Sequence, residues 1–334
     1  MSVCQLEVYA MGKINQGKVL IVLFFCLIIG LFILNIFIGT VNISANRILE
    51  PAFFEILKLR LLRALLAISA GACLSLAGVI LQAVLRNPLA EPYVLGVSSG
   101  AGLGAVIGLL FISLSIGVSV AAFIGGIITI FLVYKLAKIE GRMSPENMII
   151  AGIIVNGFLS SILMFFVSNS SSENIHSVVW WLLGNLQVYK IAPVLTLALV
   201  SCAGVLISYM FSRELNAISL GEEEAMHLGI DIEKVKITLL LVATLITSLT
   251  VSICGIIGFA GLMMPHIARR LVGPDHRMLL PASVLMGAAF LLLCDIFSKT
   301  MLAPKEIPIG VITSFIGVPF FIYVLKKSRK AYFR

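Results

Sequence analysis

The chain has 334 residues, of which 60% are hydrophobic and 12% are charged, and its formal net charge is +8. An ordinary soluble domain is about 45–50% apolar and about 25% charged, so this chain has too few charges to cover a surface exposed to water. Intrinsic disorder is also excluded, because disordered chains combine low hydrophobicity with high charge. The composition therefore indicates a protein that crosses a membrane several times.

Ten apolar segments follow one another along the chain, and each predicts a transmembrane helix. Crossing about 30 Å of hydrocarbon takes about 20 helical residues. A β-barrel is excluded because its strands alternate apolar and polar residues, whereas runs such as 284–294 are continuously apolar. The predicted spans are 18–41, 61–85, 93–111, 116–137, 146–168, 191–211, 234–254, 256–268, 278–298 and 308–325. The eighth is too short to cross a bilayer, so we expect a half-helix buried among its neighbours.

No linker or low-complexity tract divides the chain, so residues 1–334 are interpreted as one all-α polytopic membrane domain. With the N-terminus inside, 17 of the 24 Lys and Arg residues fall on the inner side and 7 on the outer side. Cytoplasmic loops carry such an excess, so we expect a multi-pass protein of the cytoplasmic (inner) membrane with both termini cytoplasmic. The lipid bilayer is its expected environment. The positive charges are scattered over several loops and both tails, which argues against a nucleic-acid partner.

Small residues recur every third or fourth position in segments 67–78 and 100–108. Such faces let membrane helices approach closely. Two interpretations are open: a packed gate or dimer seam, or close packing inside one subunit.

The sequence contains no convincing catalytic, cofactor or metal motif. Residues 96–100 match G-x-S-x-G, but the flanking sequence is apolar helix, so a membrane enzyme is disfavoured. There is no G-x-x-x-x-G-K-[ST] phosphate loop, so ATP would have to be bound by another chain. Asp295 is the one carboxylate set in an apolar run. A proton-coupled secondary transporter, which usually needs carboxylates near the midplane, is therefore a weaker alternative.

The polar loop of about 213–236 is the most organised segment outside the spans. Ser219 and Glu222 form an S-x-x-E pattern that predicts a capping box, and Gly229 predicts the end of the same helix. The expected helix from Leu220 to Leu228 carries a small apolar face made of Leu220, Ala225 and Leu228. It is either a surface for a partner protein or a solvated connector.

Together, the motifs resemble the FecCD-type permeases of ATP-binding-cassette importers for iron–siderophore, haem and cobalamin. The matching segments run in order from about residue 60 to residue 323. They are Arg60-Leu61-Leu62-Arg63, with Leu62 where proline is usual, Gly71-Ala72, Gly78, Gln82, Arg86–Pro92, Leu95-Gly96, Leu220-Gly221-Glu222, Ala225, Leu228-Gly229, Gly258-Phe259, Gly261-Leu262, Pro265-His266, Arg269, Asp275–Arg277, Asp295, Glu306–Gly310 and Gly317–Phe320.

The resemblance implies a type II importer permease. Its expected partners are a second copy of the chain, two cytoplasmic ATP-binding subunits and an extracytoplasmic substrate-binding protein. The chain itself would be a transport subunit without ATPase activity, cofactor or metal. An iron–siderophore complex is the favoured cargo, and cobalamin or haem is the alternative. The segment resembling the family's ATPase-coupling element comprises Leu220, Gly221, Glu222, Ala225, Leu228 and Gly229.

Several positive residues on the predicted outer side run against the insertion bias. Four of them lie between Arg47 and Arg63, and Lys299 ends the ninth span. The resemblance implies that Arg60 and Lys299 receive acidic residues of the binding protein. The alternative is local pairing, of Arg60 or Arg63 with Glu55 and of Lys299 with Asp295.

Overall fold

The computed structural model describes residues 3–39, 51–111, 115–139, 142–170 and 172–332. Arg47 and the end of the first predicted span, residues 40–41, lie outside these ranges. In chain order the elements are α1 (Val3–Phe37), α2 (Pro51–Val84), α3 (Val97–Phe111), α4 (Ser115–Ala137), β1 (Lys138–Ile139), β2 (Arg142–Met143), α5 (Pro145–Ser168), α6 (Ser172–Leu182), α7 (Ile191–Met210), α8 (Ser212–Leu220), α9 (Glu222–His227), α10 (Ile232–Cys254), α11 (Ala260–Val272), α12 (His276–Thr300) and α13 (Ile309–Tyr332).

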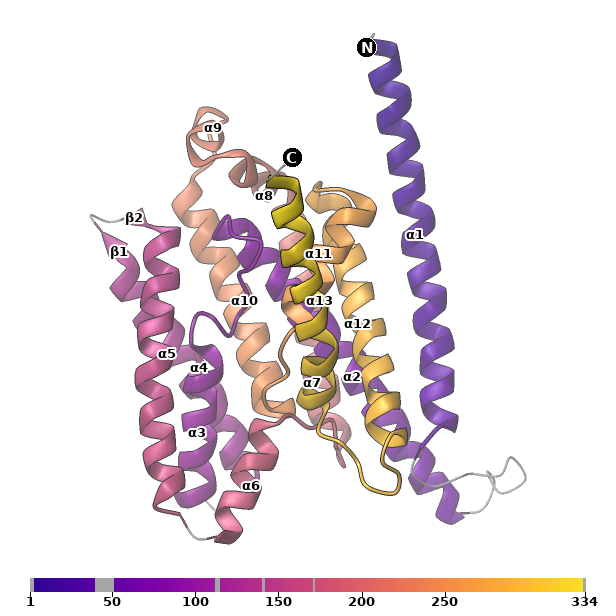
Figure 1. Cartoon of the computed structure of the whole chain (residues 1–334), viewed down its shortest axis with the longest axis vertical. Helices are drawn as coiled ribbons and strands as arrows, with labels where there is room; N and C mark the ends of the chain where they lie inside the picture. Colours follow the sequence, from indigo (N-terminus) through magenta and orange to yellow (C-terminus); the bar gives the residue numbers. More distant parts are fainter. Residues whose placement is uncertain (1–2, 40–50, 112–114, 140–141, 171, 333–334) are drawn as a thin grey trace.

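The long helices form one bundle around α2 (Figure 1). In the most apolar stretch of α2, 89% of the residues are buried, whereas the corresponding stretch of α1 is 17% buried. Helices α7, α10, α11 and α12 all contact α2, while α1 packs mainly on α12. A membrane protein can leave the outer faces of such a bundle apolar, because lipid covers them.

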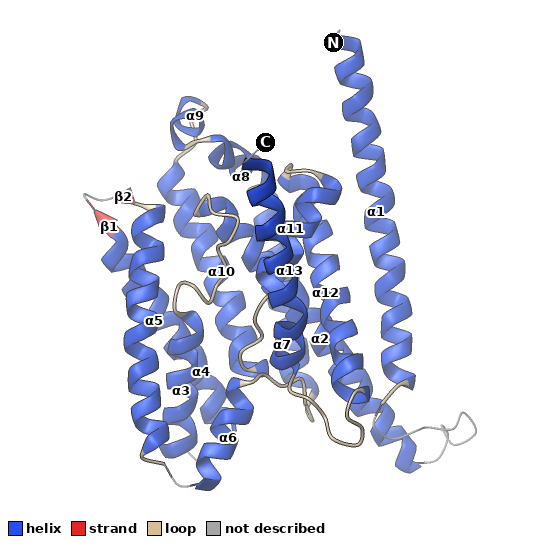
Figure 2. Cartoon of the chain, in the orientation of Figure 1, coloured by secondary structure: helices blue, strands red, loops and turns tan. Residues whose placement is uncertain are grey.

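The two ends of the bundle carry different elements (Figures 1 and 2). The N- and C-terminal ends of the chain, α8 and α9 lie at one end, which we call the α9 end. The loop between α12 and α13 and the start of α2 lie at the other, the outer end of the predicted topology. The two chain ends therefore share one end of the bundle, in agreement with an even number of crossings.

Close backbone approach explains the two small-residue faces. A Cβ on Gly71 would lie 2.1 Å from the carbonyl oxygen of Gly287 on α12, and one on Gly104 would lie 2.2 Å from that of Ala121 on α4. Both contacts join helices of the same chain. These faces are thus packing surfaces inside one subunit, the second of the two interpretations above.

All ten predicted spans are helical, but only eight are long and apolar enough to cross a membrane among the described residues. The eighth, α11, has 13 residues, as expected for a half-helix. It begins after a break at 255–259, where the φ angles of Gly255 and Phe259 are +68° and +67°. The third, α3, has 15 residues, fewer than predicted, because residues 93–96 form turns instead of helix.

Candidate functional site

Helices α8 and α9 lie at the α9 end of the bundle (Figure 1). The predicted capping box is wrong. Ser219 lies in the last turn of α8, where its Oγ donates to the Leu215 carbonyl oxygen at 2.8 Å. The segment is split by Gly221, which occupies the N-cap position of α9 without a side-chain acceptor. A short helix–turn–helix therefore stands where a single helix from Leu220 to Leu228 was expected.

The predicted stop at Gly229 is confirmed. Gly229 has φ +78° and donates to the Met226 carbonyl oxygen at 2.9 Å. The Ile230 amide donates to the Ala225 carbonyl oxygen at 3.2 Å. These two bonds form a Schellman motif, which satisfies the last carbonyl groups of α9 and needs a left-handed residue at this position.

The apolar face of this segment differs from the predicted one. Ala225 is fully buried against its own chain, so it does not lie beside Leu220 and Leu228 on a contact surface. The exposed apolar side chains are Leu220, Met226 and Leu228, with exposed fractions of 77%, 51% and 70%. We call these three residues the α9 knob.

Asn216 on α8 joins this segment to the start of α12. Its Nδ2 donates to Asp275 Oδ1 at 2.7 Å, and its Oδ1 accepts from the His276 amide at 2.8 Å. Asp275 also caps α12 by accepting from the Arg277 amide at 3.0 Å. Sequence reasoning gave Asn216 no role, since its partners lie about sixty residues further along the chain.

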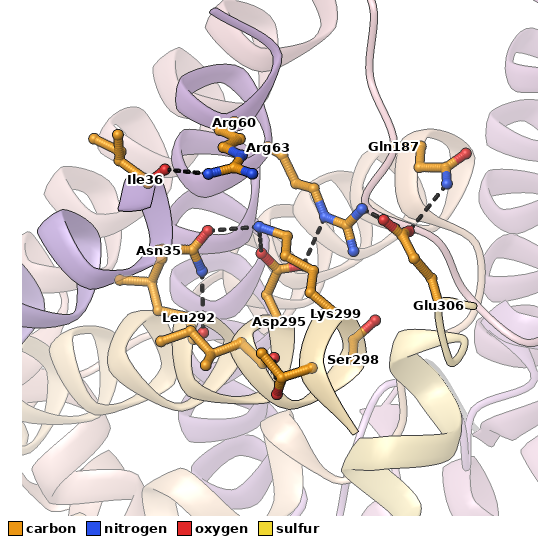
Figure 3. Close-up of polar contacts among 12 residues, drawn as sticks. Asn35, Ile36, Arg60, Arg63, Gln187, Leu292, Asp295, Ser298, Lys299 and Glu306 are labelled. Atoms are coloured by element: carbon orange, nitrogen blue, oxygen red, sulfur yellow. Dashed lines mark hydrogen bonds and ion pairs between the residues drawn. The ribbon is translucent and has the colours of Figure 1, made fainter. Parts of the chain in front are cut away.

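The second candidate site is a charged network at the outer end (Figure 3). Asp295 has no exposed surface, and its two oxygens face two cations. Arg63 Nε lies 2.7 Å from Oδ1, and Lys299 Nζ lies 2.5 Å from Oδ2. Arg63 NH1 also reaches Glu306 Oε2 at 2.7 Å. The network therefore ties α2, α12 and the loop before α13 together.

Both predicted docking residues make contacts inside the chain. Lys299 is 3% exposed and donates to Asn35 Oδ1 at 2.7 Å in addition to its pair with Asp295. Arg60 is 7% exposed and donates to the carbonyl oxygens of Ile36 and Phe37 at 2.9 and 3.0 Å. A cation at the C-terminal end of α1 is also favoured by the helix dipole.

The local-pairing alternative is confirmed for Lys299 with Asp295, and wrong for Glu55. Glu55 pairs with Lys58 instead, whose Nζ lies 3.6 Å from Glu55 Oε2. Arg63, the second arginine of the RLLR segment, takes the central place in the network. The sequence signal that could have indicated it was the lone buried carboxylate, Asp295, which needs a positive partner.

A cavity of about 370 Å³ opens beside the network at the outer end. Arg63 and Glu306 line one side of it, and His176 and Trp180 of α6 line another. Helix α6 was not predicted as an element. Among the described residues no group of three His, Cys, Asp or Glu side chains could hold a metal ion.

Comparison with known proteins gives consistent likenesses. The model of the FecCD transport family matches residues 26–327. The cobalamin import system permease protein BtuC of Halobacterium salinarum is 40% identical over 80% of this chain and 72% of its own length. The Fe(3+)-citrate import system permease protein YfmD of Bacillus subtilis is 34% identical over 96% of this chain and 99% of its own.

A solved structure has the same fold over nearly the whole chain. It is described as an inward-facing conformation of a metal-chelate type ABC transporter. It superposes with a TM-score of 0.84 at 29% sequence identity and covers 93% of this chain and 99% of that one.

Proposed function

The chain belongs to the FecCD transport family and is a multi-pass permease subunit of an ATP-binding-cassette importer, and we propose that its cargo is an iron–siderophore complex. The observation that carries the cargo is the extent of the matches. Relatives named for Fe(3+)-citrate and iron(3+)-hydroxamate import align over 96% and 95% of this chain and 99% of their own lengths. The relative named for cobalamin aligns over 72% of its own length. Cobalamin and haem are the alternative cargoes.

In this proposal two copies of the chain enclose the pathway and two ATPase subunits bind at the α9 end. The α9 knob is the contact surface, because exposed leucine and methionine side chains outside the membrane favour burial against a partner. The capped end of α9 at Gly229 and the buried Ala225 fix the shape of the segment. In this arrangement the partner ATPase subunits hydrolyse ATP.

The binding protein is proposed to dock at the outer end. Acidic residues of its lobes would compete with Asp295 and with the carbonyl groups of α1 for Lys299 and Arg60. Because both cations are already satisfied within the chain, this docking requires the network to open or shift.

Reconstitution tests the proposal. Proteoliposomes holding the chain with its ATPase and binding protein should accumulate a radiolabelled ferric hydroxamate when ATP is supplied, and labelled cobalamin or haemin should accumulate at least tenfold more slowly. Liposomes holding the chain alone should show no ATP hydrolysis and no uptake on an imposed proton gradient. Uptake on that gradient alone would assign the chain to secondary transport, and faster cobalamin uptake would reassign the cargo.

The knob is tested separately. Leu228→Glu should weaken binding of the ATPase at least tenfold while the permease dimer stays intact. Ser219→Ala, which alters a bond internal to α8, is the control and should bind the ATPase normally.

A further inference from the structure

Two side chains from the first two turns of α10 bind the connection between α4 and α5. They do so through the amide and the carbonyl oxygen of a single residue, Met143. The Met143 amide donates to Glu233 Oε2 at 3.3 Å, and the Met143 carbonyl oxygen accepts from Lys236 Nζ at 3.4 Å. Glu233 and Lys236 are three residues apart, so they lie on the same face of α10. The next residue, Ser144, caps α5 by accepting from the Asn147 amide at 3.4 Å. The start of α5 is therefore fixed to α10.

Lys236 makes a second contact, with α9. Its Nζ lies 2.7 Å from Oε1 of Glu222, the first residue of that helix. Lys236 is 1% exposed and is the largest fully buried side chain in the described part of the chain. One ammonium group thus joins three elements: α9 through Glu222, α10 through its own backbone, and the start of α5 through Met143.

A buried lysine is an expensive way to fill space, because an apolar side chain of similar length avoids removing a charge from water. What the ammonium offers is three donors on one atom, which can hold two acceptors at once. Neighbouring Lys234 shows the contrast. It is exposed and pairs with Asp231, the N-cap residue of the same helix, so this ion pair joins no second element.

We infer that Lys236 is a positioning residue that transmits displacement of α9 to the N-terminal end of α5. The inference rests on the proposed function, because α9 is displaced only if an ATPase docks on the α9 knob. Helix α5 then moves as a unit against α3 and α4, the two helices on which it mainly packs. Among the hydrogen bonds and ion pairs found in the described residues, the Lys236 ammonium is the one group that joins α9 to the segment leading into α5.

The first test uses the permease alone. Spin labels at Met226→Cys on α9 and Ile150→Cys on α5, both at exposed positions, report the distance between the two helices in a background without reactive native cysteines. Lys236→Met should broaden the distance distribution at least twofold. Lys234→Met, which removes the same charge from an exposed position, should leave it unchanged.

The second test measures coupling in the reconstituted importer as cargo transported per ATP hydrolysed. Lys236→Met should lower this ratio at least tenfold, which corresponds to about 1.4 kcal/mol. ATP hydrolysis should stay within about threefold of wild type. Lys236→Arg, which keeps the charge and the donors, should recover the ratio to within about threefold. Glu222→Gln removes the negative charge of the other partner at a half-buried position, so it serves as the second variant if Lys236→Met does not fold.

The outcomes separate the two claims. An unaltered distance distribution in Lys236→Met, an equal coupling loss in Lys234→Met, or wild-type coupling in both Lys236→Met and Glu222→Gln would overturn the inference. If Lys236→Met fails to fold, wild-type coupling in Glu222→Gln overturns it alone and a tenfold loss supports it. Absence of ATP-driven uptake by the wild-type importer would overturn the proposed function, and the label measurement would then decide whether the link itself exists.

Discussion

Replacing Asp295 by asparagine should destabilise the chain more than any other single change in the outer network. The carboxylate is fully buried and faces two cations at 2.7 and 2.5 Å. In Asp295→Asn, Arg63 keeps Glu306 as a negative partner, but Lys299 keeps only the uncharged oxygen of Asn35. Removing one partner of a buried ion pair costs about 3–5 kcal/mol, because the remaining charge is left uncompensated.

The matched control is Glu306→Gln at the exposed edge of the same network. The Glu306 side chain is 27% exposed, and Arg63 retains Asp295 when Glu306 is neutralised. Solvent screens such a pair, so the expected loss is about 1 kcal/mol or less. The double change Asp295→Asn with Lys299→Met removes both charges and should recover more than half of the loss, because neutral replacement of a buried pair is often tolerated.

Equilibrium unfolding of the purified chain in mixed detergent micelles measures all three free energies. The reasoning requires Asp295→Asn to lose at least about 2 kcal/mol more than Glu306→Gln and requires the double variant to be non-additive. Equal losses for the two single variants, or an additive double variant, would show that Lys299 is stabilised by something other than the Asp295 charge.

Three further predictions concern the packing, the α9 segment and a loop carboxyl. Gly71→Ala places a Cβ against a backbone carbonyl of α12 and should cost about 1–3 kcal/mol of unfolding free energy, whereas Gly157→Ala on α5, with open space around it, should be neutral or stabilising by up to about 1 kcal/mol. Gly229→Ala, at φ +78°, should cost about 1–2 kcal/mol of unfolding free energy and should speed proteolysis of α9. Ser219→Ala should change the proteolysis rate little. Burial raises the pKa of the Glu91 carboxyl in the loop before α3 to about 7; the folded chain then binds the proton more tightly than the unfolded chain, so stability should fall as pH rises from about 5 to about 8, and Glu91→Gln should flatten that dependence.

Periodicity and composition were sufficient for the membrane-spanning helices. Each of the ten predicted spans is helical, because a long apolar run in lipid has no other way to satisfy its backbone groups. Helix lengths were less predictable. The third span is shorter than predicted because residues 93–96 form turns instead of helix. A distant part of the chain contributes to holding these turns, since the Tyr93 hydroxyl donates to the Ile257 carbonyl oxygen at 2.9 Å.

Local patterns outside the spans were a weaker guide. The S-x-x-E pattern at Ser219 and Glu222 predicted a capping box. In the structure α8 continues to Leu220 and ends at Gly221, so Ser219 lies inside α8 and does not cap a following helix. The Glu222 carboxylate forms an ion pair with Lys236 instead of accepting from a backbone amide. A capping pattern competes with every charged group that folding brings near, and a buried ammonium is the stronger partner for a carboxylate.

Sequence patterns were sufficient to identify this chain as a helical membrane permease of the FecCD transport family, because hydrophobic length, charge bias and ordered motifs are all properties of the linear chain. Which charges lie next to one another became known from the folded chain. Arg63, Asp295 and Glu306 come from positions more than 200 residues apart at the extremes, and Lys236 reaches Met143 across 93 residues. Which partner a buried charge takes depends on distance and burial in three dimensions, and neither quantity is encoded by spacing along the chain.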